Sequence, residues 1–276
     1  MVDQDLKSIF KQGSRTYFTS SHFFPEPVRE EVIIIYGFVR TADNFVDILP
    51  QREEDFYEFW DDLRRSRAGE TEKNPVIKSF TELERKKGFP HEWANAFLRS
   101  MEMDLHKKEY RTIEEILEYI HGSAEVIGLF MASIMGLDRE SFPFARRLGR
   151  AMQYINFIRD IAEDNELGRM YFPQNEMREF GLQSLNENDV VSAREAFQSF
   201  ILAQIRRYWD WQIEAELGFR YIPGRYLIPI KTASDMYKWT ALRIEKNPFI
   251  VYKMKVKPSK MRIFRTAFSN LIARKA

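Results

Sequence analysis

Apolar side chains recur at the three-to-four-residue spacing of an α-helix along nearly the whole chain. Residues 113–136 and 145–166 show the pattern most clearly, and no run of the sequence alternates apolar and polar residues as a half-buried strand does. Glycine and proline breaks divide the chain into about eight to ten predicted helices. Because the breaks are short and no long linker or fixed repeat separates them, the pattern predicts one all-α domain over residues 1–276.

One predicted helix, residues 32–47, is apolar around most of its circumference, which is typical of a buried helix. At about 100° per residue, its polar side chains fall within an arc of roughly 60°. These side chains are those of Tyr36, Arg40, Asp43 and Asp47. A hydroxyl, a guanidinium and two carboxylates on one face of a buried helix predict that this face lines a site.

A second predicted helix, residues 152–165, carries a similar polar stripe beside large apolar residues. The stripe consists of Gln153, Asn156, Asp160 and Asp164, with Arg159 and Glu163 on its flanks. Carboxylates one helical turn apart repel each other, and burying them without a partner is costly. A solvated helix face would explain one such spacing, but two stripes on apolar helices favour a binding site.

A divalent cation would relieve the repulsion within both stripes. Mg²⁺ takes oxygen ligands and prefers one or two carboxylates together with waters and substrate phosphates. Arginine offers two parallel hydrogen bonds to phosphate oxygens, a geometry that lysine cannot match. The sequence therefore predicts a Mg²⁺–diphosphate site between the two stripes, with Arg40, Arg159 and Arg169 as phosphate ligands.

The composition narrows the range of functions. With 42 Lys+Arg against 41 Asp+Glu, the net charge is +1, which argues against nucleic acid as a partner. The chain has no cysteine, so disulfides, thiolate metal sites and cysteine nucleophiles are excluded, and we expect a cytoplasmic protein. We expect no transmembrane segment, because no run reaches the roughly 18 apolar residues of a spanning helix and the first residues lack a signal-peptide pattern.

Four segments, in sequence order, resemble the squalene/phytoene synthase family. The first is residues 13–17 (GSRTY), which is similar to the family's substrate flap, and the second is Tyr36-x₃-Arg40-x₂-Asp43-x₃-Asp47, which resembles its first aspartate-rich motif. Residues 119–128 (YIHGSAEVIG) resemble its mid-chain helix, and residues 153–173 (QYINFIRDIAEDNELGRMYFP) closely match its second aspartate-rich motif and the loop that follows. The resemblance implies a single prenyl synthase domain, folded as an isoprenoid-synthase-type helical bundle around a central cavity.

The family resemblance also implies roles for individual residues. Metal ligands would be Asp43, Asp47, Asn156, Asp160 and Asp164. The catalytic set would be Tyr36, Arg40 and the four aspartates, with Tyr237 closing the site. Substrate would be bound by Ser14, Arg15, Thr16, Tyr17, Tyr36, Arg40, Gln153, Asn156, Arg159, Arg169, Tyr237 and Lys255.

The activity implied by the resemblance is Mg²⁺-dependent, head-to-head (1-1′) condensation of two farnesyl or geranylgeranyl diphosphates. The reaction would pass through a cyclopropylcarbinyl diphosphate to phytoene, dehydrosqualene or squalene, and we lean towards phytoene-type products. The C15 or C20 length of the substrate stays open at this point. So does the use of NADPH, because the sequence has no dinucleotide fingerprint and family members that use NADPH need none.

Three positions depart from the family pattern. Asn44 stands where many members have a further aspartate, although Asp43 and Asp47 keep the ligand spacing. His121 replaces a common tyrosine, and Lys255 replaces a frequent arginine. We expect His121 and Lys255 to matter for orienting or re-ionising the intermediate more than for assembling the metal site.

Three other readings compete with the family assignment. A trans-prenyl elongase or terpene cyclase would carry a DDxxD motif, which is absent from the sequence. A di-iron bundle would need two Glu-x₂-His motifs, whereas only Glu118-x₂-His121 is present. An inactive relative that acts as a scaffold or assembly factor should lose its metal carboxylates first, and all four aspartates are retained.

The C-terminal segment, residues 259–276, is amphipathic. Its apolar face is formed by Met261, Phe264, Phe268, Leu271 and Ile272, with Lys260, Arg262 and Arg274 off that face. We expect this face to pack against the core of the protein. Because the substrate and product would both be lipids, we also expect peripheral membrane contact.

Overall fold

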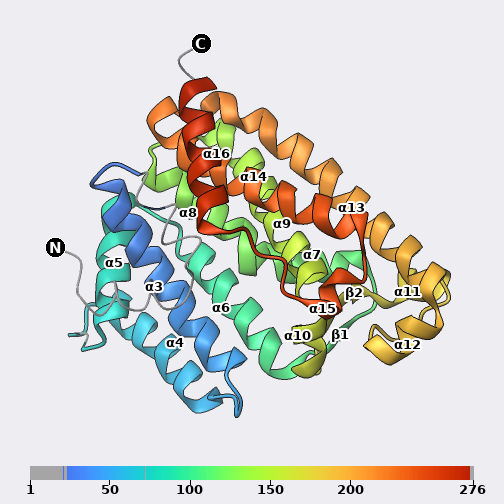
Figure 1. The fold of residues 1–276 in the computed structure, drawn as a ribbon. Coiled ribbons are helices and arrows are strands. Elements are labelled where there is room, and N and C mark those ends of the chain that lie inside the picture. Colours follow the sequence, from blue (N-terminus) through green and yellow to red (C-terminus); the bar gives the residue numbers. More distant parts are fainter. Residues whose placement is uncertain (1–20, 22–23, 72, 274–276) are drawn as a thin grey trace.

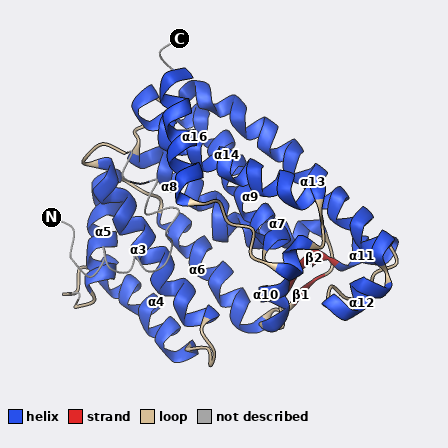
Figure 2. Ribbon diagram, in the orientation of Figure 1, coloured by secondary structure: helices blue, strands red, loops and turns tan. Residues whose placement is uncertain are grey.

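The computed structural model describes residues 21, 24–71 and 73–273, and this part of the chain is almost entirely helical (Figures 1 and 2), which confirms the all-α prediction. The first half contains α3 (Val28–Asp47), α4 (Glu53–Arg67), α5 (Pro75–Lys87), α6 (His91–His106), α7 (Ile113–Ile120), a π-helical turn η1 (His121–Glu125) and α8 (Val126–Ile134). The second half contains the 3₁₀ turn η2 (Arg139–Ser141), α9 (Phe142–Arg159), α10 (Ile161–Glu166), α11 (Gln174–Glu179), α12 (Glu187–Ser192), α13 (Arg194–Glu216), the 3₁₀ turn η3 (Leu217–Tyr221), α14 (Gly224–Lys246), α15 (Ile250–Lys253) and α16 (Lys260–Ala273).

The helices are more interrupted than the sequence pattern predicts. Residues 113–134 are divided by η1, and the helix predicted over residues 152–165 is bent at Asp160, where α9 ends and α10 begins. The backbone at Asp160 has φ −100° and ψ 14°. Helical hydrogen bonds nevertheless continue through the bend, from the amide of Asp160 to Asn156 O (2.8 Å) and from the amide of Asp164 to Asp160 O (2.9 Å). The bend therefore redirects the helix without breaking its hydrogen-bond ladder.

A short parallel ladder lies at one end of the bundle and was not predicted. It joins β1 (Glu109–Tyr110) to β2 (Met170–Pro173), pairing Glu109 with Met170. These strands have two and four residues, which is too short for an alternating pattern to stand out in the sequence. The ladder fixes the loop after α10 beside the end of α6 (Figure 2).

Glycines let the central helices approach one another closely. A Cβ on Gly122 of η1 would lie 2.1 Å from the carbonyl oxygen of Ala96 on α6. A Cβ on Gly149 of α9 would lie 2.3 Å from the carbonyl oxygen of Ala124 on η1. Since neither side chain would fit, α6, η1 and α9 pack backbone to backbone. This contact fixes α9, which carries the second aspartate stripe, against the first half of the bundle.

Aromatic packing anchors α3, which carries the first stripe. The Phe38 ring is completely buried and stacks on Phe80 of α5, with ring centroids 3.9 Å apart. It also lies 5.4 Å from the ring of Phe59 on α4 and 5.8 Å from the ring of Phe97 on α6. One side chain on the face opposite the cavity thus holds α3 to three neighbouring helices.

The structure contradicts the expectation that the apolar face of α16 packs against the core. The residues that were predicted to face inward are exposed, with Phe268 64% exposed: Met261, Phe264, Phe268, Leu271 and Ile272. The inward side is instead narrow and formed by Ile263 and Ala267, which are buried. The Asn270 amide completes this contact by donating to the carboxylate of Asp235 on α14 at 2.9 Å. Ile263, Ala267 and Asn270 dock α16 on α14 (Figure 1), and the other large apolar side chains of the helix point outward.

None of the described helices has the length and apolarity needed to cross a membrane.

Replacing Phe38 by alanine should lower the free energy of unfolding by about 3–5 kcal/mol, because it leaves a cavity where four helices meet. The matched change Phe268→Ala removes an exposed ring of the same size and should cost less than about 1 kcal/mol. Urea denaturation of the two variants and the wild type measures both values. Equal losses in the two variants would contradict this account of how α3 is held.

Candidate active site

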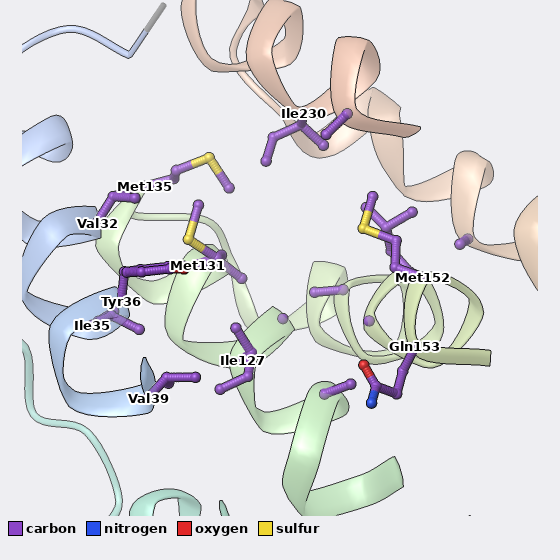
Figure 3. A pocket seen from close by; sticks show the side chains of 18 of the residues that line it. Val32, Ile35, Tyr36, Val39, Ile127, Met131, Met135, Met152, Gln153 and Ile230 are labelled. Atoms are coloured by element: carbon purple, nitrogen blue, oxygen red, sulfur yellow. The ribbon is translucent and has the colours of Figure 1, made fainter. Parts of the chain in front are cut away.

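Two adjoining chambers lie between α3, α6, α8, α9 and α14. The larger chamber is polar and has a volume of about 850 Å³, and the smaller one is apolar and has a volume of about 460 Å³. They share six lining residues: Arg40, Asp43, Tyr119, Gln153, Asn156 and Ala233. Figure 3 shows the apolar chamber, with Ile35 and Val39 of α3 on one side, Ile127 of α8 below, Met152 of α9 on the other side and Ile230 of α14 above. A ligand with a charged head and an apolar tail would fit this arrangement.

The wall formed by α3 brings the first predicted stripe together. The guanidinium of Arg40 forms an ion pair with the carboxylate of Asp43, and both residues line both chambers. Asp47 lines the polar chamber, and its carboxylate accepts a hydrogen bond from Arg169 at 2.7 Å. Tyr36 lines the apolar chamber. The prediction that these four side chains share one cavity-facing side of the helix is confirmed.

The opposite wall, formed by α9 and α10, carries the second stripe. Gln153, Asn156, Arg159, Asp160 and Asp164 all line the polar chamber. The guanidinium of Arg159 donates to the carboxylate of Asp160 at 2.8 Å. The ammonium of Lys255, which lies between α15 and α16, is 3.3 Å from the same carboxylate. The two aspartate pairs therefore face one chamber, as the sequence predicted.

The chamber disfavours negative charge on its own carboxylates. Burial raises the pKa of Asp43 well above its usual range, and the neighbouring charge of Asp47 raises it further. Burial also raises the pKa of Asp164, with a further contribution from Asp160. A raised pKa favours the protonated form of these two carboxyl groups, and a bound cation would lower their pKa values again.

The donor set fits a cation that is shared with a ligand rather than enclosed by protein. No group of three or more Asp, Glu, His or Cys side chains converges closely enough to hold a metal ion by itself in the described residues. Mg²⁺ typically binds through one or two carboxylates and completes its shell with waters and substrate phosphates. A further oxygen ligand is at hand, because the side-chain carbonyl oxygen of Asn156 is buried and has no hydrogen-bond partner. The residues thus fit a cation–diphosphate group placed between the walls, and their roles as metal ligands remain predictions.

Basic side chains surround the same chamber, but they are not equivalent. Arg40, Arg159 and Lys255 line it as predicted, and Lys257 adds a cationic group that the sequence pattern did not single out. Burial lowers the pKa of Lys257, and the nearby charges of Lys255 and Arg159 lower it further. A bound polyanion would remove this mutual repulsion, which supports diphosphate as the ligand of the chamber.

Arg169 lies at the chamber but is fixed by protein contacts. It is only 4% exposed, and its guanidinium donates to the carboxylate of Asp47, to Val46 O at 2.6 Å and to Asp104 O at 3.3 Å. These contacts use both terminal nitrogens. The geometry therefore fits a role in holding Asp47 better than the predicted role in direct phosphate binding.

Tyr237 lines the polar chamber, as predicted for a residue that closes the site. The predicted substrate residues Ser14, Arg15, Thr16 and Tyr17 lie outside the described residues. Their roles stay predictions.

His121 is not among the residues that line either chamber. Its ring is half-exposed, and Nδ1 lies 3.2 Å from the carboxylate of Glu125, which also binds Arg146 and Arg150. The structure shows no contact of His121 with either chamber, and its expected role in orienting the intermediate stays a prediction. Its side chain belongs to a charge cluster on the outer side of η1, whereas Lys255 does reach the chamber.

The structure adds Asp104 to the polar chamber, a residue that the sequence analysis did not select. It lies on α6 between apolar residues and has no second acidic residue one helical turn away on the same face, so periodicity alone gave no signal. Burial raises the pKa of Asp104 to about 6, against the opposing charge of Arg169. The tyrosines that bind it, Tyr119 and Tyr171, come from α7 and β2.

Comparison with known proteins gives a consistent result. The model of the squalene/phytoene synthase family matches residues 10–262. The chain is 27% identical over 259 residues to the 15-cis-phytoene synthase of Paracoccus sp. (strain N81106 / MBIC 01143), covering 90% of this chain and 84% of that protein. It is 26% identical over 246 residues to the 15-cis-phytoene synthase of Pantoea ananas, covering 85% of this chain and 79% of that protein.

Solved structures share the fold. The squalene synthase HpnC of Alicyclobacillus acidocaldarius superposes with a TM-score of 0.79 at 23% identity, covering 89% of this chain and 94% of that one. A dehydrosqualene synthase in complex with ligand superposes with a TM-score of 0.81 at 19% identity, covering 99% and 96%. At these identities the likeness establishes the helical fold.

The metal-free protein should lose stability as the pH rises above the ordinary carboxyl range of about 4. A carboxyl group whose pKa is raised on folding holds its proton more tightly in the folded state, and the stability this confers is lost as the pH passes through the raised pKa. Asp43→Asn should therefore reduce the fall in melting temperature between about pH 5 and pH 8 in EDTA, whereas Asp210→Asn, at an exposed position, should not. An unchanged slope in Asp43→Asn would show that this carboxyl is not held protonated.

Proposed function

The chain belongs to the squalene/phytoene synthase family, and we propose that it condenses two prenyl diphosphates head to head (1-1′) through a cyclopropylcarbinyl diphosphate. The proposal rests on one observation: the polar and apolar chambers meet between the two walls that carry the aspartates, α3 on one side and α9 with α10 on the other. Charged groups for a diphosphate lie on one side of this boundary, and apolar side chains for a prenyl tail lie on the other. The curated relatives that are named 15-cis-phytoene synthase support phytoene as the product.

Ionisation of the first substrate requires stabilisation of the departing diphosphate. A divalent cation, which we propose to be Mg²⁺, would neutralise part of that charge when held by Asp43, Asp47, Asp160 and Asp164 with Asn156. The side chains of Arg40, Arg159 and Lys255 would bind the remaining phosphate oxygens. Each of these three cationic side chains forms an ion pair with an aspartate in the structure. It can turn to the phosphate once the metal cation binds that aspartate.

The apolar chamber would hold the prenyl tails and keep water from the carbocation. Its described lining is dominated by aliphatic and methionine side chains, such as Ile35, Val39, Met131 and Met152 (Figure 3). Water excluded by these side chains cannot quench a carbocation before it couples to the second prenyl chain. The proposal places C–O cleavage and C–C bond formation at the boundary of the chambers. It treats residues 1–276 as a single prenyl synthase domain.

Incubation of the purified protein with farnesyl or geranylgeranyl diphosphate, followed by mass spectrometry of the hydrocarbons, tests the function and identifies the substrate length. Parallel reactions with EDTA, with added Mg²⁺ and with NADPH test the cation and the reduction of the product. A protein with no product under any of these conditions would instead support the inactive scaffold.

Replacing Asp160 by asparagine should reduce formation of both the cyclopropyl diphosphate and the hydrocarbon by at least roughly 10²-fold, since several kcal/mol of charge stabilisation are lost before the first ionisation. The control Asp210→Asn removes an exposed carboxylate and should retain wild-type rates. Both products are quantified by mass spectrometry from the same reactions. Near-normal hydrocarbon output from Asp160→Asn would overturn the assignment of the aspartate walls.

We also propose that α16 docks on the surface of a membrane that contains anionic lipids. Its outward face carries Phe268 and the other exposed apolar residues described above, and Lys260, Arg262 and Arg265 are exposed on the same helix. An amphipathic helix with basic residues beside its apolar face complements an anionic bilayer in charge and in polarity. Substrates and products of the proposed reaction are lipids, which supports this choice of partner.

The double change Phe268→Ser/Ile272→Ser should lower binding to anionic vesicles by at least about tenfold, because it removes two apolar side chains that would enter the lipid. The control Val191→Ser/Leu202→Ser alters exposed apolar residues on α12 and α13 and should bind like the wild type. Co-sedimentation measures both. Equal binding by the two variants would exclude α16 as the docking element, and a mass that depends on protein concentration would indicate a second copy of the chain as the partner.

A further inference from the structure

Asp104 is a buried carboxylate that the cation and phosphate roles leave unexplained. It is 2% exposed and lines the polar chamber from α6. No lysine or arginine of the described chain forms a salt bridge with its carboxylate; Arg169 contacts only its main-chain oxygen. Burying a carboxylate costs several kcal/mol unless hydrogen bonds compensate it, so its partners indicate its purpose.

Both carboxylate oxygens of Asp104 accept hydrogen bonds from tyrosines. The hydroxyl of Tyr171 donates to Oδ1 at 2.5 Å, and the hydroxyl of Tyr119 donates to Oδ2 at 2.7 Å. A phenol has a single O–H proton, so each tyrosine commits its only proton to Asp104. Tyr171 has further partners, because its oxygen also accepts a hydrogen bond from the guanidinium of Arg169 at 3.5 Å and its ring stacks on Phe157. Tyr119 lines both chambers, so it can offer its ring and the lone pairs of its oxygen at their boundary.

The rings themselves form a wall of the polar chamber. Tyr171 stacks on Phe157, with centroids 4.5 Å apart and ring planes 9° apart, and Tyr119 lies 5.1 Å from Tyr171. All three rings line the polar chamber, and Tyr119 also lines the apolar one. Tyr119 is therefore at the boundary where a prenyl tail would meet its diphosphate.

We propose that Asp104 is a positioning residue that fixes Tyr119 as an electron-rich group facing the carbocation formed in the reaction, while Tyr171 holds the other carboxylate oxygen. An aromatic ring face attracts a cation through its quadrupole, and a phenol oxygen whose proton is bound to Asp104 presents its lone pairs. The inference rests on the proposed function, because it requires a carbocation at the chamber boundary.

The arrangement predicts a specific kinetic effect. Asp104→Asn keeps the size of the side chain but loses its charge and can donate as well as accept, which frees the tyrosine protons to turn into the chamber. It should lower kcat at least about tenfold, which corresponds to 1.36 kcal/mol of barrier, while KM changes less than about threefold. The Mg²⁺ concentration for half-maximal activity should also stay within about threefold, because Asp104 is not assigned to the cation.

The matched control is Ser100→Ala. Ser100 is equally buried on the same helix and donates to the main-chain oxygen of Tyr119 at 2.9 Å, so its loss perturbs the same contact between α6 and α7 without touching the phenol–carboxylate bonds. It should lower the melting temperature comparably but leave kcat within about twofold. A fall in kcat for Ser100→Ala equal to that of Asp104→Asn would reduce the effect to packing and overturn the proposal.

A double-mutant cycle tests the route of the effect. If Asp104 acts through the phenols, adding Asp104→Asn to Tyr119→Phe/Tyr171→Phe should cause little further loss, because the hydroxyls are already gone. Fully multiplicative losses, or a tenfold shift in the Mg²⁺ requirement, would assign Asp104 to the cation site instead. If Asp104→Asn does not fold, Tyr119→Phe still decides the question, since wild-type kcat in that variant would overturn the proposal. Normal kcat in Asp104→Asn defeats this inference alone, whereas a wild-type protein without product defeats the proposed function.

Discussion

The structure depends on the placement of several carboxylates inside one cavity of low polarity. Such charges repel one another and are poorly solvated, so they need nearby positive groups or hydrogen-bond donors. In the described structure the positive groups come from four different places: α3 (Arg40), the end of α9 (Arg159), the residue before β2 (Arg169) and the segment between α15 and α16 (Lys255). The chamber therefore ties distant parts of the chain together by charge. The same ion pairs keep arginine and lysine side chains beside the site that a diphosphate would occupy.

Close backbone packing determines where the cavity can exist. At Gly122 and Gly149 there is no room for a side chain, because the walls meet there backbone to backbone. The π-helical turn η1 lies at these contacts, and such turns insert a residue that shifts the register of the following helix. The cavity opens where the same helices carry larger side chains that point inward. The contact between Gly149 and Ala124, both of which line the apolar chamber, thus holds two walls of that chamber together.

Helical periodicity was sufficient to predict the two aspartate stripes, because residues three and four apart on a helix share a face in any fold. It did not reveal Asp104, whose partners Tyr119 and Tyr171 are 15 and 67 residues away and meet it only in the folded chain. Periodicity also did not reveal the bend at Asp160, because the helical hydrogen-bond ladder continues through it. For α16, amphipathicity located a face correctly but not its direction, because an apolar face can point to a core or to a partner. Sequence order does not tell which side of η1 faces the cavity, so it did not reveal that His121 lies outside the lining of both chambers.

The two chambers differ in how tightly they specify a ligand. The polar end is built from charged groups with directional contacts, and few ligands other than a cation and a phosphate would satisfy them. The apolar end is lined in part by Met131, Met135 and Met152, whose unbranched side chains adopt many shapes (Figure 3). Flexible walls can close around tails of different length at little cost. The chemistry of the head group can therefore be predicted from residue spacing. The length of the prenyl tail cannot, because it depends on how these methionines repack around a bound chain.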